Sequence, residues 1–364
     1  MRFMQIQTFY GAYLSVFYGA RPGLAERPYQ EQIDALLDDG YCGAHLRTPY
    51  LAQLGYECQL VISNCVEAQA QWAIAHGIAP PQNLMESICL VLRQIEVFKP
   101  DILYFTDPIS FDSRYVRVLS YRPALVMGWR AAMIPPGIDW SEFDLILSSD
   151  EDCLRQALEH GAKASVFFRP HFPAFIAQAV ADQPKQWDVV FSGQITTGHM
   201  DRLQLLCEIA RAPFGSRGDF TPAFFLATGN PQMLPAGLAM YDRGSVWGLD
   251  MHRAIKSARI LFNVHIDMAA KKSLNMRTFE TVGTGSFLLT EESDVLPEFF
   301  EPGREVETYR NAGELLDKIY YYLEHDRERE EIARRGQERC LRDFGADKGA
   351  LELDQLIRRH LAAK

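Results

Sequence analysis

The sequence predicts an α/β protein made of two doubly wound domains. Its 364 residues exceed the size of one comfortable hydrophobic core and favour two domains. Short apolar runs alternate with longer stretches of helical periodicity along the chain, which is typical of parallel sheets wrapped by crossover helices. The alternation loosens once, around residues 169–185, and then starts afresh. We therefore expect two domains of the same class that face each other across a cleft.

The first half of the chain predicts an N-terminal domain of residues 1–180. In the stretch 84–98 the apolar residues recur at spacings of three and four, which fits one buried helix stripe. The expected strands are residues 4–9, 58–63, 102–106, 125–128, 145–148 and 164–168, and the expected helices are residues 29–39, 68–76, 84–98 and 151–160.

The second half predicts a C-terminal domain of residues 181–345. Its expected strands are residues 189–192, 223–227, 260–264, 287–290 and 306–309, and its expected helices are residues 201–210, 251–257, 275–282, 312–323 and 327–344. A last amphipathic helix is expected within residues 346–364. This helix can cross back over the N-terminal domain.

Composition excludes several classes of protein. A net charge of −10 argues against nucleic-acid binding, which needs a coherent basic face. No apolar run approaches the roughly 18 residues that a membrane span needs, and the N-terminus lacks a signal-peptide pattern. The seven cysteines are scattered and never spaced C-x-x-C, which favours reduced thiols over a zinc knuckle or a disulfide framework. We expect a folded cytoplasmic protein with no transmembrane segment.

Residues that follow the expected strands are the first candidates for a site, because ligands of open α/β sheets bind at the carboxyl ends of strands. Gly11 either lets the backbone approach a ligand or forms a plain tight turn. Asp107 is either a general base facing the cleft or a helix N-cap. His265 either lines the cleft or is a structural histidine. Together with Asp267 it lacks the third ligand that a metal needs, so no metal site is expected.

A candidate anion site follows the first strand of the second half. Small residues around Gly193 precede a helix start, and their backbone amides could bind a phosphate that Arg202 reaches from the first helical turn. The segment is neither a Walker A motif nor G-x-G-x-x-G, so a simple capped helix start is the alternative.

The stretch 271–290, KKSLNMRTFETVGTGSFLLT, gathers Lys272, Asn275, Arg277 and Glu280. A helix that begins near Asn275 would place Arg277 and Glu280 on one face. Helix N-terminal amides and an arginine fork suit a diphosphate, and a carboxylate suits a sugar diol. A solvated helix is the alternative, but an asparagine at the N-cap position and a glycine-containing turn before the next strand favour a ligand site.

The second half resembles a known family. The run Ser273 to Glu280, Gly283, Gly285, Leu288-Leu289-Thr290 and Glu301-Pro302-Gly303 looks like the C-terminal domain of CgeB-like bacterial glycosyltransferases. These proteins are related to the large retaining group of nucleotide-sugar enzymes with the GT-B fold. The resemblance thus implies a GT-B architecture of two Rossmann-like domains. It is specific over the second half and extends to the first half only in organisation.

The resemblance implies a metal-independent glycosyltransferase that acts in polysaccharide biosynthesis. Such an enzyme moves a sugar from a nucleoside diphosphate donor to a glycan or other surface-associated acceptor, needs no cofactor, and can contact a membrane peripherally. The donor would lie mainly on the second domain. Glu280 would bind the ribose hydroxyls, Asn275 and Arg277 would lie near the diphosphate, and Gly193 with Arg202 would close its other side.

Lys272 departs from the family pattern. Many retaining relatives carry two glutamates in an E-x7-E arrangement, and if Glu280 is the second, the first position falls on Lys272. The stereochemistry therefore stays open: an inverting reaction needs a base such as Asp107 or His265, whereas a retaining reaction does not. Two alternatives stay open as well, namely a nucleotide-sugar epimerase or hydrolase on the same fold and a non-catalytic nucleotide-sugar binder.

Overall fold

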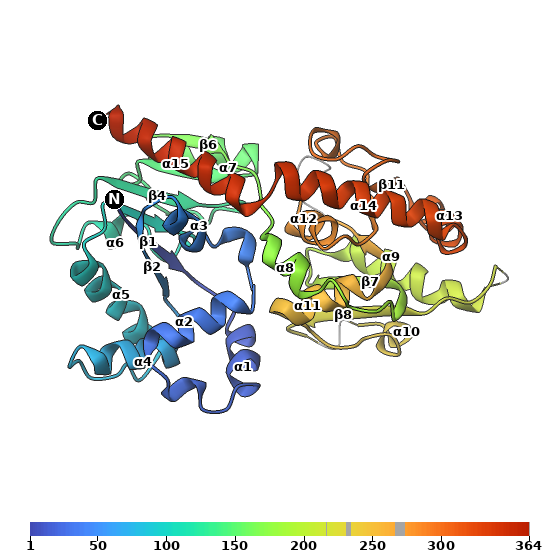
Figure 1. The fold of residues 1–364 in the computed structure, drawn as a ribbon, viewed down its shortest axis with the longest axis horizontal. Coiled ribbons are helices and arrows are strands. Elements are labelled where there is room, and N and C mark those ends of the chain that lie inside the picture. Colours follow the sequence, from blue (N-terminus) through green and yellow to red (C-terminus); the bar gives the residue numbers. More distant parts are fainter. Residues whose placement is uncertain (216, 231–233, 266–273, 364) are drawn as a thin grey trace. The chain divides into compact units, whose positions relative to one another are not determined.

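The chain divides into two compact units. The computed structural model describes residues 1–215, 217–230, 234–265 and 274–363 (Figure 1). Unit 1 consists of Met1–Arg169 together with Ala346–Lys364, and unit 2 consists of Pro170–Gly345. Each unit has one parallel sheet with a buried apolar cluster on either face, so each unit is a three-layered α/β structure.

The sheet of unit 1 has the strand order β2-β1-β3-β4-β5-β6, with every pairing parallel. Its strands are β1 (Arg2–Gln7), β2 (Glu57–Ile62), β3 (Ile102–Phe105), β4 (Leu125–Trp129), β5 (Leu145–Ser148) and β6 (Ser165–Phe167). Because β1 pairs with β2 on one side and with β3 on the other, the strand order reverses between β1 and β3.

The helices of unit 1 cover both faces of this sheet. They are α1 (Gly11–Gly19), α2 (Tyr29–Asp38), α3 (Thr48–Gln53), α4 (Val66–Ala75), α5 (Leu84–Phe98), α6 (Ser113–Val116), α7 (Glu151–Glu159) and α15 (Ala346–Ala362). The start of α5 is fixed by Asn83, whose side chain accepts a hydrogen bond from the backbone amide of Glu86 at 3.0 Å.

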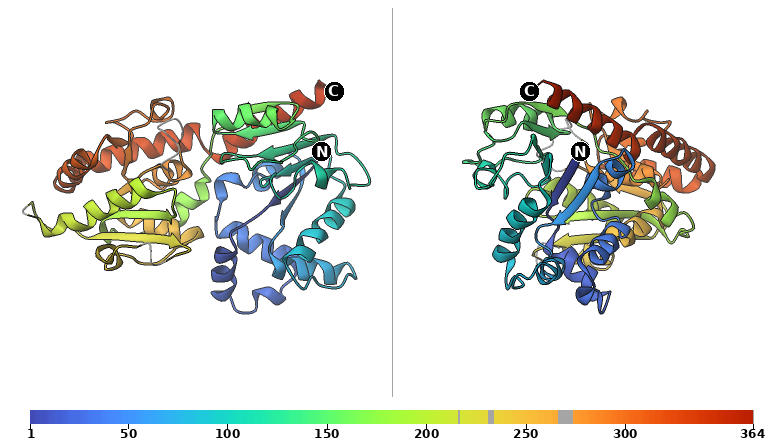
Figure 2. Two further views of the ribbon diagram at one scale, coloured as in Figure 1. Left: turned by 180° about the vertical axis from the view of Figure 1, so that it is seen from behind. Right: turned by 60° about the vertical axis from the view of Figure 1, so that its left-hand side comes forward.

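Helix α15 completes unit 1 from the far end of the chain. It packs against α3 and β4, and both views of Figure 2 show it alongside the sheet of unit 1. Leu353 and Ile357 share an apolar cluster with Phe3 of β1. The hydroxyl of Tyr56 donates to Asp354 Oδ1 at 2.6 Å, which fixes the register of the helix on the unit.

The sheet of unit 2 has the strand order β11-β10-β9-β7-β8 and is also parallel throughout. Its strands are β7 (Trp187–Ile195), β8 (Pro222–Thr228), β9 (Ala258–Asn263), β10 (Leu288–Glu291) and β11 (Glu307–Tyr309). Its helices are α8 (Ala174–Ala179), α9 (Met200–Arg211), α10 (Ala236–Ala239), α11 (Gly248–Lys256), α12 (Met276–Gly283), α13 (Ala312–Glu324) and α14 (Asp326–Asp343).

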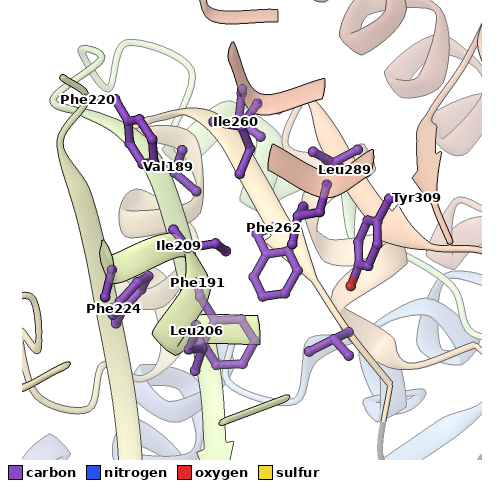
Figure 3. Close-up of a cluster of buried hydrophobic side chains, with 14 of the residues drawn as sticks. Val189, Phe191, Leu206, Ile209, Phe220, Phe224, Ile260, Phe262, Leu289 and Tyr309 are labelled. Atoms are coloured by element: carbon purple, nitrogen blue, oxygen red, sulfur yellow. The ribbon is translucent and has the colours of Figure 1, made fainter. Parts of the chain in front are cut away.

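Two apolar clusters hold the layers of unit 2 together. One lies between the sheet and helices α9 and α13; it contains Phe191 and Phe262, whose ring centroids are 5.8 Å apart (Figure 3). The other lies on the opposite face and includes Phe279 of α12. These clusters use the alternate residues of each strand, as burial on both faces requires.

The doubly wound α/β class predicted from the sequence is confirmed, and each expected strand is present. Two details differ. Residues 170–180 group with unit 2 rather than with the N-terminal domain, because the amide of Phe172 donates to the Phe344 carbonyl at 2.7 Å and Phe172 packs in the cluster of Phe279. Gly11, expected in a turn or a close backbone approach, is instead the first residue of α1.

Gly336 of α14 marks a close contact that we expect to tolerate no side chain. A Cβ there would lie 2.3 Å from the carbonyl oxygen of Glu305 and 3.0 Å from Cγ1 of Val282. Gly336→Ala should therefore lower the free energy of unfolding by about 1–3 kcal/mol, even though alanine is the better helix former. Urea denaturation measures the change.

Gly237→Ala is the matched control, because a Cβ at Gly237 meets no described atom within 4 Å. This variant should be neutral or slightly stabilising. Equal stability of the Gly336 and Gly237 variants would contradict the close packing at α14.

Candidate functional site

The carboxyl ends of β7 and β9 form the switch point of the unit 2 sheet. Strand β7 pairs with β8 on one side and with β9 on the other, so the chain runs from β7 to β8 in one direction and from β8 back past β7 to β9 in the other. Open α/β sheets bind their ligands at such a point. The loop after β7, the end of β9 and the start of α12 meet here, and we take them as the candidate site.

Arg202 joins the two strand ends. It lies on α9 and is 7% exposed, and its guanidinium donates to the carbonyl of Gln194 at 2.6 Å and to the carbonyl of Val264 at 3.1 Å. The guanidinium also lies over the ring of Phe191, 5.5 Å from its centroid. The sequence analysis expects Arg202 to reach a phosphate; the structure uses two of its donors to link β7 to β9 and places its positive charge at the switch point.

The loop after β7 is closed by contacts of its own. Gly193 lies on β7, where a Cβ would come 2.8 Å from the ring of Phe191. The hydroxyl of Thr196 lies 2.7 Å from Nδ1 of His199, and the amides of Gly198 and His199 donate to the side chain and the carbonyl of Thr196. These amides, which the sequence analysis assigns to an anion, thus have partners inside the loop.

An asparagine pair fixes the start of α12. Asn275 caps the helix by accepting from the amide of Thr278 at 3.3 Å, and its Nδ2 donates to Asn263 Oδ1 at 3.0 Å. Asn263 ends β9 and in turn donates to Thr290 Oγ1 of β10 at 3.0 Å, while the hydroxyl of Tyr309 donates to the Asn263 carbonyl at 2.9 Å. The N-terminus of α12 is therefore anchored to the ends of three neighbouring strands.

The sequence analysis names Asn275 as a site residue but gives no such role to Asn263, Thr290 or Tyr309. Their positions in the sequence could have identified these residues, because each is a polar residue at or near the carboxyl end of an apolar strand.

Arg277 and Glu280 form an ion pair on one face of α12, as their spacing predicts. Arg277 Nη1 lies 2.8 Å from Glu280 Oε2, and the two side chains are 15% and 16% exposed. The same guanidinium donates through Nε to the Ser192 carbonyl of β7 at 3.2 Å, and its Nη1 lies 3.0 Å from Met251 Sδ on α11. The pair is therefore held against the sheet and a second helix.

His265 and Glu291 form a second polar pair. His265 follows β9 and is 4% exposed, and its Nδ1 lies 3.4 Å from Oε2 of Glu291 at the end of β10. Its Nε2 has no hydrogen-bond partner among the residues that the structure describes. Glu291 is a further residue that the sequence analysis does not name; only the adjacency of β9 and β10 brings it to His265.

The remaining predicted residues lie elsewhere or outside the described chain. In unit 1, Gly11 and Asp107 follow β1 and β3, the strands that flank the switch point of that sheet. Asp107 Oδ1 accepts from the amide of Ser110 at 3.2 Å within a turn at residues 108–111, and the helix that follows, α6, is capped by Asp112. Lys272 and Asp267 fall outside the described residues.

The described residues contain no group of three His, Cys, Asp or Glu side chains placed to bind a metal ion. All seven cysteines are free thiols. Among the described helices, none is both long and apolar enough to cross a membrane.

Residues 204–355 match the model of a family described as "Glycosyl transferase-like". No curated protein matches the sequence.

Solved structures of similar fold include Anabaena Alr3699/HepE in complex with UDP and glucose, with a TM-score of 0.62 at 10% identity, covering 99% of this chain and 100% of that one. A glycosyltransferase from Rickettsia africae has a TM-score of 0.60 at 10% identity, covering 99% and 98%. Sucrose-phosphate synthase from Thermosynechococcus elongatus has a TM-score of 0.55 at 11% identity and covers both chains fully.

The two-domain α/β fold is that of the GT-B glycosyltransferases, so the fold predicted from the sequence is confirmed. The match over residues 204–355 makes this part of the chain similar to a glycosyltransferase-like family, in agreement with the predicted class of function.

Two buried histidines make the stability of the protein depend on pH. Burial and the adjacent charge of Arg277 lower the pKa of His252 on α11 to about 3. Burial, with the charge of Arg47, lowers the pKa of His45 in unit 1 to about 3 as well. Both imidazoles are thus neutral in the folded protein at neutral pH.

We expect the free energy of unfolding to fall as the pH drops from about 6.5 towards 3. In this window the unfolded histidines bind protons that the folded ones do not, so stability rises with pH by up to about 1.4 kcal/mol per pH unit for each histidine. Above about pH 6.5 the contribution is complete. Urea denaturation over a pH series measures the slope.

His252→Phe should remove one histidine's share of this slope. Phe300→Leu, which loosens the same face of unit 2 without removing a titrating group, should lower stability equally at every pH. A slope that His252→Phe leaves unchanged would show that His252 binds its proton with the same pKa in the folded and unfolded states.

Proposed function

We propose that the protein is a hexosyl-type glycosyltransferase that uses a nucleoside diphosphate sugar as donor and a hydroxyl group of a glycan or other surface-associated molecule as acceptor. The observation that carries the proposal is the switch point of unit 2, where an anchored helix N-terminus and a half-buried carboxylate lie in a glycosyltransferase-like sequence. Structures of Alr3699/HepE contain UDP or UDP-glucose, so a uridine diphosphate sugar is the first donor to test.

Each residue at the switch point has a part in donor binding. Glu280 offers carboxylate oxygens to the two ribose hydroxyls. Asn275 holds the positive end of the α12 dipole for the diphosphate, and Arg202 adds a fixed positive charge. Gly193, with Arg202, closes the other side of the diphosphate, and Lys272 supplies a further cation.

The reaction separates charge, and this sets what the site must supply. Positive charge develops at the anomeric carbon and negative charge on the departing diphosphate, so cations and a helix dipole at the diphosphate lower the barrier. We propose that these groups act without a metal ion or another cofactor.

His265 is the better candidate for a general base if the reaction inverts. Its Nδ1 faces the Glu291 carboxylate, which favours the tautomer with the proton on Nδ1 and leaves Nε2 to accept the acceptor's proton. Asp107 is the second candidate, but one of its oxygens already accepts from an amide. A retaining reaction would need neither residue as a base.

We propose further that the protein is a CgeB-like bacterial enzyme of polysaccharide biosynthesis. In this proposal it acts in the cytoplasm and can contact a membrane peripherally. The free cysteines support a reducing compartment. The alternatives are a nucleotide-sugar epimerase or hydrolase and a non-catalytic nucleotide-sugar binder.

One assay separates the three functions. The full chain is incubated with a panel of nucleoside diphosphate sugars, UDP-glucose first, with and without a panel of mono- and oligosaccharides, in buffer containing EDTA. Release of nucleoside diphosphate only when a saccharide is present supports transfer. Epimer formation or acceptor-independent release supports the second function, and binding without turnover supports the third. Transfer that appears only after Mg²⁺ or Mn²⁺ is added would contradict metal independence.

Glu280→Ala should weaken donor binding. Loss of hydrogen bonds between a carboxylate and two hydroxyls predicts a rise in the Kd of UDP of about 10- to 100-fold, measured by titration calorimetry. Glu338→Ala, which removes an exposed glutamate of α14, should leave the Kd unchanged. If Glu280→Ala binds UDP as the wild type does, the donor site lies elsewhere.

His265→Gln should lower kcat by about 10²- to 10⁴-fold if the reaction inverts, with donor affinity unchanged. Asp107→Asn is the companion variant. Loss of kcat in Asp107→Asn alone would move the base to Asp107, and full activity in both variants would leave a base-independent, retaining reaction.

A further inference from the structure

The guanidinium of Arg277 is held on several sides within unit 2. Nε donates to the Ser192 carbonyl at 3.2 Å, and Nη1 lies 2.8 Å from Glu280 Oε2 and 3.0 Å from Met251 Sδ. These partners come from β7, from α12 itself and from α11. A planar group with contacts in several directions has little freedom to turn.

From this geometry we propose that Arg277 is a positioning residue. It orients the Glu280 carboxylate towards the ribose of the nucleotide and so makes the site selective for ribonucleotides over 2′-deoxyribonucleotides. The inference rests on the proposed function and deepens it. It gives Arg277 a different role from the diphosphate contact that the sequence predicts.

The orientation of Glu280 follows from how its oxygens are used. Oε2 accepts from Arg277, and a carboxylate has about four lone-pair sites, so acceptor capacity remains for ribose hydroxyls. A glutamate side chain otherwise loses considerable rotamer entropy when a ligand fixes it. Because the ion pair fixes the carboxylate before the nucleotide arrives, binding avoids most of that loss.

The charges of the pair argue against a diphosphate contact. The positive charge of Arg277 is balanced by Glu280 within one turn of α12, so the pair as a whole offers a diphosphate little net attraction. His252 beside Arg277 adds no positive charge near neutral pH, because burial and Arg277 lower its pKa to about 3. Attraction for the diphosphate comes instead from the N-terminus of α12 and from Arg202.

Selectivity follows from the same carboxylate. A nucleotide without the 2′-hydroxyl would cover an oxygen of Glu280 and give it no hydrogen bond in return. Sites built to bind a hydroxyl reject analogues that lack it for this reason. A carboxylate that turns freely could reach water instead, so the discrimination depends on Arg277 holding it.

The test compares UDP with 2′-deoxy-UDP by titration calorimetry on the full chain. We expect the wild type to prefer UDP by about 10- to 100-fold. Arg277→Met should reduce this preference to within a few-fold, with little change in the Kd of 2′-deoxy-UDP. Arg277→Lys keeps the charge but lacks the planar fork, and it should lose the preference in the same way.

A double variant protects the test against misfolding. Arg277→Met alone leaves a half-buried carboxylate without its partner, whereas Arg277→Met with Glu280→Ala leaves neither charge unpaired. The double variant should show the same loss of preference as Glu280→Ala alone, because the two residues act as one unit. Thermal unfolding of each variant confirms that it is folded.

Each of the remaining outcomes contradicts either the inference alone or the proposed function as well. If Arg277→Met weakens UDP and 2′-deoxy-UDP equally and keeps the preference, Arg277 contacts the diphosphate and the inference is wrong. If Arg277→Met with Glu280→Ala keeps the preference, Glu280 does not contact the 2′-hydroxyl and the inference is wrong as well. A wild type that binds both nucleotides equally well also overturns the inference, while the proposed function stands. If the donor panel identifies GDP or ADP instead, the same comparison uses that nucleotide and its 2′-deoxy form. A wild type that binds no nucleoside diphosphate overturns the proposed function and the inference with it.

Discussion

The candidate site depends on one buried cation that ties two strands together. Arg202 donates to the carbonyls that end β7 and follow β9, at the point where the strand order of unit 2 reverses. The Val264 carbonyl that it binds also lies 3.4 Å from Nδ2 of Asn275, the cap of α12. Because Arg202 is buried, the loss of either contact should lower the stability of the protein, since a charge without partners is poorly tolerated in the interior. The position of α12, and with it Arg277 and Glu280, is set by this junction.

Charge is distributed unevenly over the junction. Arg202 and the start of α12, whose first turn has no acidic residue, contribute positive potential, whereas Arg277 is paired with Glu280. The pair of His265 and Glu291 lies one strand further along the sheet edge. The candidate site thus has three distinct parts, namely a cationic part, a charge-balanced ion pair, and a polar pair of histidine and glutamate.

The sequence predicts the strands well because a strand buried on both faces is a nearly unbroken apolar run, as in Ile102–Phe105. Helix α1 escapes prediction because its residues are apolar almost all round and Tyr10 gives it no side-chain cap. Arg277 and Glu280 are neighbours on one helix turn, so spacing finds them. Ser192 lies 85 residues from Arg277, and only the packing of α12 against β7 brings its carbonyl into contact.

Unit 1 contains Met1–Arg169 and Ala346–Lys364, so the whole of unit 2 is inserted into it in the order of synthesis. The last turns of α15 leave the ribosome only after every residue of unit 2. Until then, the apolar face that Leu353 and Ile357 cover on unit 1, including Phe3, is exposed. Unit 2 is a contiguous segment and can complete its fold first, which reverses the usual N-terminal-first order. A ribosome that stalls before residue 346 therefore leaves a finished unit 2 joined to a first unit with an uncovered hydrophobic face.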